Sequence, residues 1–300
     1  MTTAPNTRAI ERRLGDWARG RLPGWAAEFV MFVLKQGWAA LFGILLLVGL
    51  LASKALWQPG WPVARYDALV LYAIGLQVLF LWARLETLAE ARVILLFHLT
   101  GTAMEIFKIR AGSWAYPEPG MLKLLGVPLF SGFMYASVGS YMARVMRIFE
   151  MRFAPFPPYW QVATLAVAIY VNFFAHHYLP DIRLALFAAT ALVFLRTRIW
   201  FYVHRHPYWM PLPVAALLSS FFLWIAENIG TLTGTWVYAL TDETQWHMVS
   251  FAKMGSWYLL LYVAFATVTL VTRDMLSPVP LRPEARWMPG ADQPEKETAA

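Results

Sequence analysis

The chain has 300 residues, of which 59% are hydrophobic and only 14% are charged. Soluble domains carry roughly 25% charged residues, so this composition excludes an ordinary soluble domain and equally a disordered chain. Cysteine is absent, which excludes disulfides, thiolate metal sites and a cysteine nucleophile. The formal net charge is +7, and its meaning depends on where the basic residues lie.

Residues 1–30 form a basic segment ahead of the first long apolar run. Ile10, Leu14 and Trp17 recur at helical spacing among five arginines, which predicts a basic amphipathic helix on the cytoplasmic membrane surface. A tail that only sets the orientation is the alternative. No signal-peptide pattern is present.

Eight apolar segments follow, each near the ~20 residues that a membrane-spanning helix needs. They are expected at Trp38–Leu56, Tyr66–Ala83, Arg92–Phe107, Leu125–Met146, Trp160–Tyr178, Arg183–Val203, Trp209–Gly230 and Met248–Val271. Seven or nine spans are the alternatives, because segment ends are the least certain part of such a prediction. Residues 276–300, rich in proline and charge, are expected to be a disordered cytoplasmic tail.

The basic residues predict the orientation of these spans. Of the 25 Lys and Arg residues, 17 fall on the side that holds both termini and six on the opposite side. The excess predicts a multi-pass protein of the bacterial cell inner membrane with both termini in the cytoplasm. The positive charge is then a topology signal, and we expect no nucleic-acid partner.

Two stretches repeat one pattern: a glutamate, then glycine, tryptophan and tyrosine seven, nine and eleven positions later. The two sets are Glu105, Gly112, Trp114, Tyr116 and Glu227, Gly234, Trp236, Tyr238. A shorter echo pairs residues 138–141 with 254–257. The copies are four spans apart, so both enter the membrane in the same direction.

The sequence therefore predicts an all-α integral membrane fold with about eight transmembrane helices in two parallel four-helix repeats. The repeat halves cover about 31–150 and 155–275 of a single transmembrane domain, 31–275. In parallel-repeat membrane proteins the functional site lies between the halves, near mid-depth.

Glu105 and Glu227 lie near the ends of the third and seventh predicted spans. A carboxylate in hydrocarbon costs roughly 2.5–3.5 kcal/mol, so such residues face a bundle interior, a cavity or a partner. His98 and Thr102 share a helix face with Glu105, and Asn228 neighbours Glu227. We expect the two glutamates to be catalytic and these three neighbours to bind substrate.

The basic residues near the two glutamates differ. Lys108 follows Glu105 by three residues and can reach it on a helix, whereas the nearest base to Glu227 is Lys253, early in the eighth span. This difference predicts an ionised, paired Glu105 and a Glu227 that keeps a proton, which would supply a base and an acid to one site. Lys253 and the tryptophan and tyrosine of each repeat are expected to contact substrate.

A structural interpretation is the alternative. The glutamates and lysines would then only hold the two halves together, and Gly112 and Gly234 would only permit tight turns. No zinc, Walker, Rossmann or nucleophile-elbow pattern appears in a usable context, so we expect no metal and no cofactor.

Residues 101–118 and 126–141 resemble a bacterial membrane family known as a domain of unknown function, family number 817. The resemblance covers most of residues 30–275 and implies no activity. A looser likeness to membrane carotenoid hydratases and lycopene cyclases rests on Glu105, Gly112, Tyr116 and residues 126–128. It implies protonation of an isoprenoid double bond by a carboxylic acid, although Trp114, Lys108 and Arg110 depart from that pattern.

Three functions follow as hypotheses. The first is a membrane-embedded acid–base enzyme acting on an apolar, isoprenoid-type lipid, with aromatic faces holding a cation. It requires a cavity lined by apolar and aromatic groups and open to lipid. The second is a proton-coupled small-molecule transporter, which requires polar vestibules on both sides. The third is a non-catalytic membrane assembly protein, which requires no internal cavity.

Overall fold

The computed structural model describes residues 13, 16–17, 20–58, 60–203, 207–238 and 246–279. Most of this part of the chain is helical. Its α-helices are α2 (Gly24–Ala39), α3 (Leu41–Leu56), α4 (Arg65–Trp82), α5 (Leu88–Arg110), α6 (Phe130–Ile148), α7 (Tyr159–Ala175), α8 (Arg183–Phe194), α9 (Leu212–Leu232) and α10 (Ala252–Val268). A short 3₁₀ helix, η1, covers Arg273–Met275.

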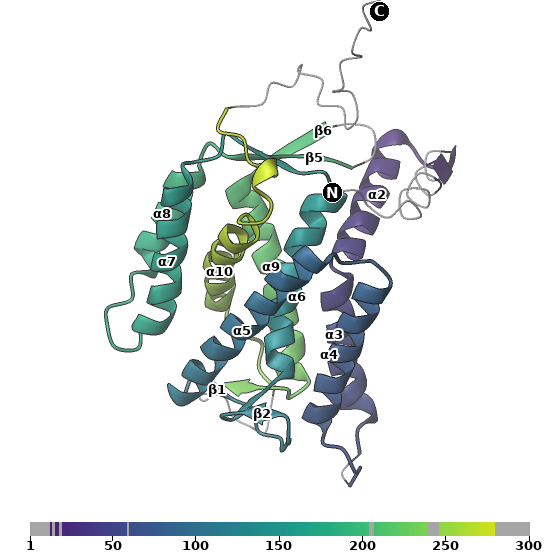
Figure 1. The fold of residues 1–300 in the computed structure, drawn as a ribbon, viewed down its shortest axis with the longest axis vertical. Coiled ribbons are helices and arrows are strands. Elements are labelled where there is room, and N and C mark those ends of the chain that lie inside the picture. The colour runs from purple at the N-terminus through teal and green to yellow at the C-terminus, as the bar shows by residue number, and fades with distance from the viewer. Residues whose placement is uncertain are drawn as a thin grey trace, which may run out of the picture.

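The expectation of an all-α fold misses three small antiparallel sheets. Their strands are β1 (Trp114–Ala115), β2 (Lys123–Leu124), β3 (Val127–Pro128), β4 (Arg152–Ala154), β5 (Arg198–Tyr202), β6 (Pro207–Pro211) and β7 (Val237–Tyr238). The sheets are β1–β7, β2–β3 and β4–β5–β6. The helices run between two ends of the molecule, with β1 and β2 at one end and β5 and β6 at the other (Figure 1). We name these the β1–β7 end and the β5–β6 end.

Several predicted spans have different limits in the structure. The first apolar run begins earlier, as α2, and bends by 68° between α2 and α3. The sixth, expected to reach Val203, ends as a helix at Phe194, because residues 199–202 are Ile-Trp-Phe-Tyr and pair as a strand. The fourth helix starts at Phe130 rather than Leu125, after the β2–β3 hairpin.

Length and apolar composition together identify fewer spans than the sequence predicted. Among the described residues, α4 and α9 are each long and apolar enough to cross a membrane, and the bent pair α2–α3 passes if it is taken as one span. Helices α7, α8 and α10 are apolar but shorter. The predicted N-terminal amphipathic helix and the C-terminal tail lie largely outside the described residues.

Helices α6 and α10 form the centre of the bundle. They contact each other; α5 packs on α6, and α9 packs on α10. Two further helices connect these pairs. α3 contacts α9 of the α9–α10 pair, and α7 contacts α5 of the α5–α6 pair. The largest hydrophobic cluster joins α6, α7 and α10 to the β4–β5–β6 sheet.

Close approach of α5 and α6 depends on glycine. An added Cβ on Gly101 would lie 2.6 Å from the Tyr135 side chain, and one on Gly132 would lie 2.5 Å from His98 and Thr102. These glycines let the two helices interlock, and Gly101 leaves space for Tyr135 to lie beside α5.

Candidate functional site

The two helices that carry the glutamates, α5 and α9, each end in a turn of the same type. After α5, Gly112 has φ +69°, and the Ser113 N–H donates to the Lys108 carbonyl at 2.9 Å. After α9, Gly234 has φ +63°, and the Thr235 N–H donates to the Gly230 carbonyl at 3.0 Å. This left-handed glycine cap reverses the chain. The residues after each glycine therefore fold back toward the glutamate of the preceding helix.

Glu105 is 3% exposed and accepts hydrogen bonds from three neutral aromatic donors. Trp114 Nε1 and Tyr116 Oη donate to Oε2 at 2.7 and 3.1 Å. Tyr135, from α6, donates to Oε1 at 2.7 Å. We call these three donors the Glu105 cage.

Glu227 has an equivalent set of donors. Trp236 Nε1 lies 3.3 Å from Oε1, and Tyr238 Oη also donates to Oε1. Trp257, from α10, donates to Oε2 at 2.9 Å. These donors, the Glu227 cage, follow Glu227 by 9, 11 and 30 residues, the same separations as in the Glu105 cage.

The sequence echo does not align the third donors of the two cages with each other. The echo aligns Tyr141 with Trp257, but Tyr135 makes the contact equivalent to that of Trp257. Tyr141 instead donates to Gln36 Oε1 at 2.9 Å.

The two cages are joined by the β1–β7 ladder. Trp114 lies opposite Tyr238, and Ala115 lies opposite Val237. The Trp114 and Tyr238 rings meet edge to face with centroids 6.1 Å apart. The ladder therefore fixes the position of one carboxyl group relative to the other.

The loop tyrosines of the cages remain proton donors. Burial, followed by the nearby Glu105 carboxylate, raises the pKa of Tyr116 well above its usual range. Burial, followed by Glu227, does the same for the pKa of Tyr238. Both hydroxyls therefore stay protonated at physiological pH and can only donate to the carboxylates.

Lys253 lies where the two cages meet. Its Nζ is 4.1 Å from the Tyr238 ring centroid and 5.3 Å from that of Trp114. Its charge interacts with both Glu227 and Glu105. Lys253 therefore occupies one face of each of these two cage rings, while Trp114 and Tyr238 both line the cavity described below.

Lys108 does not contact Glu105 as the helical spacing predicted. Its Nζ lies 2.9 Å from His177 Nε2 and 4.0 Å from the Phe173 ring centroid. Both partners belong to the end of α7 and the turn after it. The side chain therefore points across to the α7 side, and every hydrogen bond described for Glu105 comes from a neutral donor.

A cavity of about 940 Å³ lies beside the two cages. Both glutamates, all six cage residues and Lys253 line it. The remaining wall is mostly apolar and extends to Phe153, Ile199 and Phe201 at the β5–β6 end. The cavity thus has a polar end at the glutamates and an apolar end at the β4–β5–β6 sheet.

Three predicted substrate-binding residues lie away from this cavity. His98 packs edge-on against Phe133, with centroids 4.6 Å apart, and Thr102 donates to the His98 carbonyl at 2.8 Å. Asn228 bridges the Trp224 carbonyl and the Val249 N–H at 2.7 and 2.9 Å. His98 and Thr102 are kept from the cavity because α6 packs on their face of α5, and Asn228 is engaged by the backbone of Trp224 and Val249.

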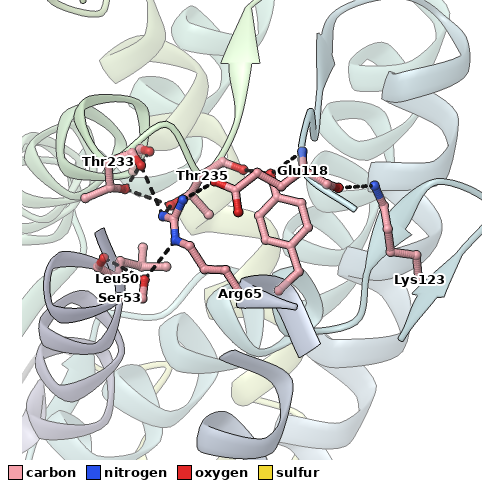
Figure 2. A network of polar contacts seen from close by, with 9 residues as sticks. Leu50, Ser53, Arg65, Glu118, Lys123, Thr233 and Thr235 are labelled. Carbon is pink, nitrogen blue, oxygen red and sulfur yellow. Dashed lines mark hydrogen bonds and ion pairs between the residues drawn. The ribbon is translucent and has the colours of Figure 1, made fainter. Parts of the chain in front are cut away.

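A polar network at the β1–β7 end holds the cage loops in place (Figure 2). Arg65, at the start of α4, donates to Ser53 Oγ at 3.0 Å, to the Thr233 carbonyl at 3.1 Å and to Thr235 Oγ1 at 3.0 Å, and it pairs with Glu118. This guanidinium connects the loop of the Glu105 cage to the turn of the Glu227 cage. In the sequence, the signal for this role is a charged residue at the start of an apolar helix, a position that by itself indicates only a basic residue outside a span.

Metal binding has no evident location in this part of the chain. Among the described residues, no group of three or more His, Asp or Glu side chains could hold an ion.

Comparison with known proteins agrees with the resemblance found in the sequence. A family model described as "Protein of unknown function (DUF817)" matches residues 28–265. The chain is 41% identical over 241 residues to the "Uncharacterized protein YoaT" of Bacillus subtilis (strain 168), covering 80% of this chain and 90% of that protein. No solved structure matches the chain.

Proposed function

For this chain, which belongs to the DUF817 family, we propose an acid–base enzyme of the bacterial cell inner membrane that acts on an apolar, isoprenoid-type lipid. The observation that carries the proposal is the pair of caged glutamates at the polar end of a largely apolar cavity of about 940 Å³. An assembly protein would need no such cavity.

The surface supports a membrane location. Large apolar side chains are exposed on the outer faces of several helices, among them Leu71 and Val78 on α4, Val167 on α7, Leu192 on α8 and Phe222 on α9. Apolar exposure on so many elements is unfavourable in water and is expected of a surface that faces lipid. Eight passes result if α2–α3 counts as one bent span and each later helix as one.

Two parallel four-helix halves account for the packing. The bent span α2–α3 followed by α4, α5 and α6 would correspond to α7, α8, α9 and α10. The contacts of α5 with α6 and of α9 with α10 then become equivalent, as do those of α3 with α9 and of α7 with α5. In this arrangement, the contacts between α6 and α10 and between β1 and β7 would fall near the axis that relates the halves.

Lipid reaches the cavity from the side. Val33, Ile44, Leu218 and Phe222 line the cavity and are also exposed on the outer surface. The first two belong to α2 and α3, and the other two to α9, which contacts α3. An apolar substrate in the bilayer therefore enters between α2–α3 and α9 without crossing water.

The chemistry follows from two carboxyl groups held by one ladder. One glutamate of the pair, in its carboxylic acid form, transfers a proton to a substrate double bond, leaving a carbocation and a carboxylate. The other glutamate then accepts a proton, either from a neighbouring carbon or from a water that attacks the cation. The first course moves a double bond and the second adds water; each returns the pair to its starting state once the proton passes back between the two glutamates.

Mass spectrometry of apolar lipids tests the proposal. Cells expressing the wild type are compared with cells expressing Glu105→Gln, Glu227→Gln or Glu86→Gln, the last being a buried carboxyl outside the cavity. The lipids are separated by chromatography before detection, and we expect a species whose mass (water added) or retention time (double bond moved) differs between wild-type and non-expressing cells. This species should be lost in the first two variants and retained in Glu86→Gln. Identical lipid profiles in all strains, with every variant folded, would refute catalysis on a resident lipid.

A proton-coupled transporter is the second candidate. The observation that favours it is the depth of the cavity, which extends from the glutamates to the β4–β5–β6 sheet. The apolar wall at that inner end argues against it, because a carrier needs a polar vestibule there. Proton-dependent uptake into proteoliposomes, abolished in Glu105→Gln and Glu227→Gln, would support the transporter instead.

A further inference from the structure

Lys108 is a buried cation that the acid–base proposal leaves unused. It is 2% exposed, lines the cavity and has His177 and the Phe173 ring as its contacts among the described residues. Its ammonium group donates to His177 Nε2, so that ring nitrogen must be unprotonated. A buried ammonium normally pairs with an anion, because burial without one is costly.

Two further cations lie near Lys108 at this end of the cavity. Arg183 and Lys253 both line the cavity, and the charges of all three residues repel one another. Arg183 is paired with Asp181 at 2.9 Å, and Lys253 interacts with the glutamates. Among the described residues, neither Lys108 nor Lys253 forms a direct ion pair with a carboxylate, and Lys108 has only the charge of Asp181 as an electrostatic counterpart.

The balance of charges indicates that the cation cluster can bind an anion. Among the described residues, the three cations have Glu105, Glu227 and Asp181 as their electrostatic counterparts. The proposed mechanism places one transferable proton on the glutamate pair, which leaves one excess positive charge at the polar end. An anion delivered by the ligand would restore neutrality there.

We infer that the cavity binds an anionic amphiphile, such as a phosphate ester of an isoprenoid chain. Lys108, Arg183 and Lys253 bind the headgroup oxygens, and the hydrocarbon chain lies along the apolar wall toward the β5–β6 end. This inference rests on the proposed function and names its substrate class. The headgroup stays at the β1–β7 end, so the double bond nearest to it lies beside the caged glutamates.

Binding to the purified full-length protein in uncharged detergent provides the test. The probes are farnesyl phosphate, farnesol and inorganic phosphate, and the readout is quenching of tryptophan fluorescence, since three cage tryptophans line the cavity. We expect farnesyl phosphate to bind at least about tenfold more tightly than farnesol, as a charge-assisted contact predicts. Equal affinity of the two, or full competition by inorganic phosphate at the same concentration, would overturn the inference.

Matched variants locate the headgroup. Lys108→Gln and Lys253→Gln are expected to weaken farnesyl phosphate binding about tenfold and to leave farnesol binding unchanged. Arg110→Gln removes a positive charge from the same end of α5 at an exposed position outside the cavity and is expected to have no effect. Lys108→Arg keeps the charge and is expected to keep the binding, which separates lost charge from lost folding.

The two proposals fail in distinguishable ways. If farnesyl phosphate binds in a charge-dependent way but cellular lipids do not change, the headgroup site is supported and the proposed enzyme activity is refuted. A lipid conversion that depends on Glu105 and Glu227, with no preference for the phosphate over the alcohol, would retain the enzyme and make its substrate neutral.

Discussion

Buried carboxylates in this protein are satisfied in two ways. Glu90 pairs with Arg147 at 3.1 Å, a direct ion pair that fixes helix positions. Glu105 and Glu227 instead accept three hydrogen bonds each from neutral aromatic groups. An ion pair commits a carboxylate to its cation, whereas neutral donors fix its position without adding an opposite charge. Glu86 also accepts from neutral groups, Ser140 and Gln77. Glu105 and Glu227 differ from it because their donors are aromatic side chains that line the cavity.

Glu86, in the turn between α4 and α5, provides a pH-dependent prediction. Burial raises the pKa of Glu86 above its usual 4.5, and hydrogen bonds from Ser140 and Gln77 and the charge of Arg144 only partly offset it. Folding therefore favours the protonated form, and its contribution to stability is present below pH 4.5 and is lost as pH rises through the folded-state pKa. Glu86→Gln, which stays neutral, should gain thermal stability relative to wild type as pH rises from 4 to 8. A difference in melting temperature that does not vary with pH would contradict this prediction.

Among the helices, α5 and α9 share one structural feature: each ends in a glycine cap that places aromatic donors around its glutamate. Each glycine cap reverses the chain. The residues two and four positions after the glycine therefore reach back to the glutamate of the helix that the glycine ends. This local relation explains why the sequence alone identified Glu105, Trp114 and Tyr116 as a set and found its copy. The structure brings both sets together and adds the members that local spacing could not reveal.

Replacing the cap glycines tests this feature. Gly112→Ala and Gly234→Ala each place a Cβ on a left-handed backbone, which costs about 1–2 kcal/mol. Both should lower the unfolding temperature and reduce lipid conversion, because the cage tryptophan follows each glycine. Gly75→Ala, at an exposed position of α4 with no neighbouring atom within 4 Å, should be neutral or stabilising. Thermal unfolding of the three variants side by side checks the expectation, and equal losses at all three would refute it.

The parts of the site that sequence analysis missed come from distant segments. Tyr135 and Trp257 lie 30 residues from their glutamates, and Arg65 reaches Thr235 across 170 residues. Periodicity reports which face a residue occupies but not which helix covers that face. His98 and Thr102 were assigned to substrate for this reason, although α6 packs over them. Apolar runs gave most of the helices but could not separate the strand at 198–202 from the helix before it.

For the molecule as a whole, the cavity and its exposed apolar lining determine the proposed route of substrate entry. Apolar groups on α2, α3 and α9 line the cavity and are also exposed, so the proposed side opening would face the hydrocarbon of a bilayer. Access from the membrane plane would select apolar substrates by partitioning, before any specific contact forms.

Narrowing this opening tests the route. Leu218→Trp adds bulk at a residue that lines the cavity and is 52% exposed on α9. It should lower lipid conversion and the amount of lipid that co-purifies, with both glutamates intact. Leu192→Trp changes an exposed residue of α8 that does not line the cavity and should have no such effect. Equal conversion by wild type and Leu218→Trp would exclude entry between α3 and α9.

The ladder between β1 and β7 has a consequence for how the two halves can evolve. Each strand contributes two residues, and the ladder pairs Trp114 with Tyr238 and Ala115 with Val237. A substitution that shifts one strand shifts the other, so neither cage loop can change independently at this seam. If the proposed repeat arose from a duplicated ancestor, the two sites would have stayed interdependent here even as the surrounding helices diverged. Differences between the proposed halves would then be tolerated in the helices more readily than at the seam.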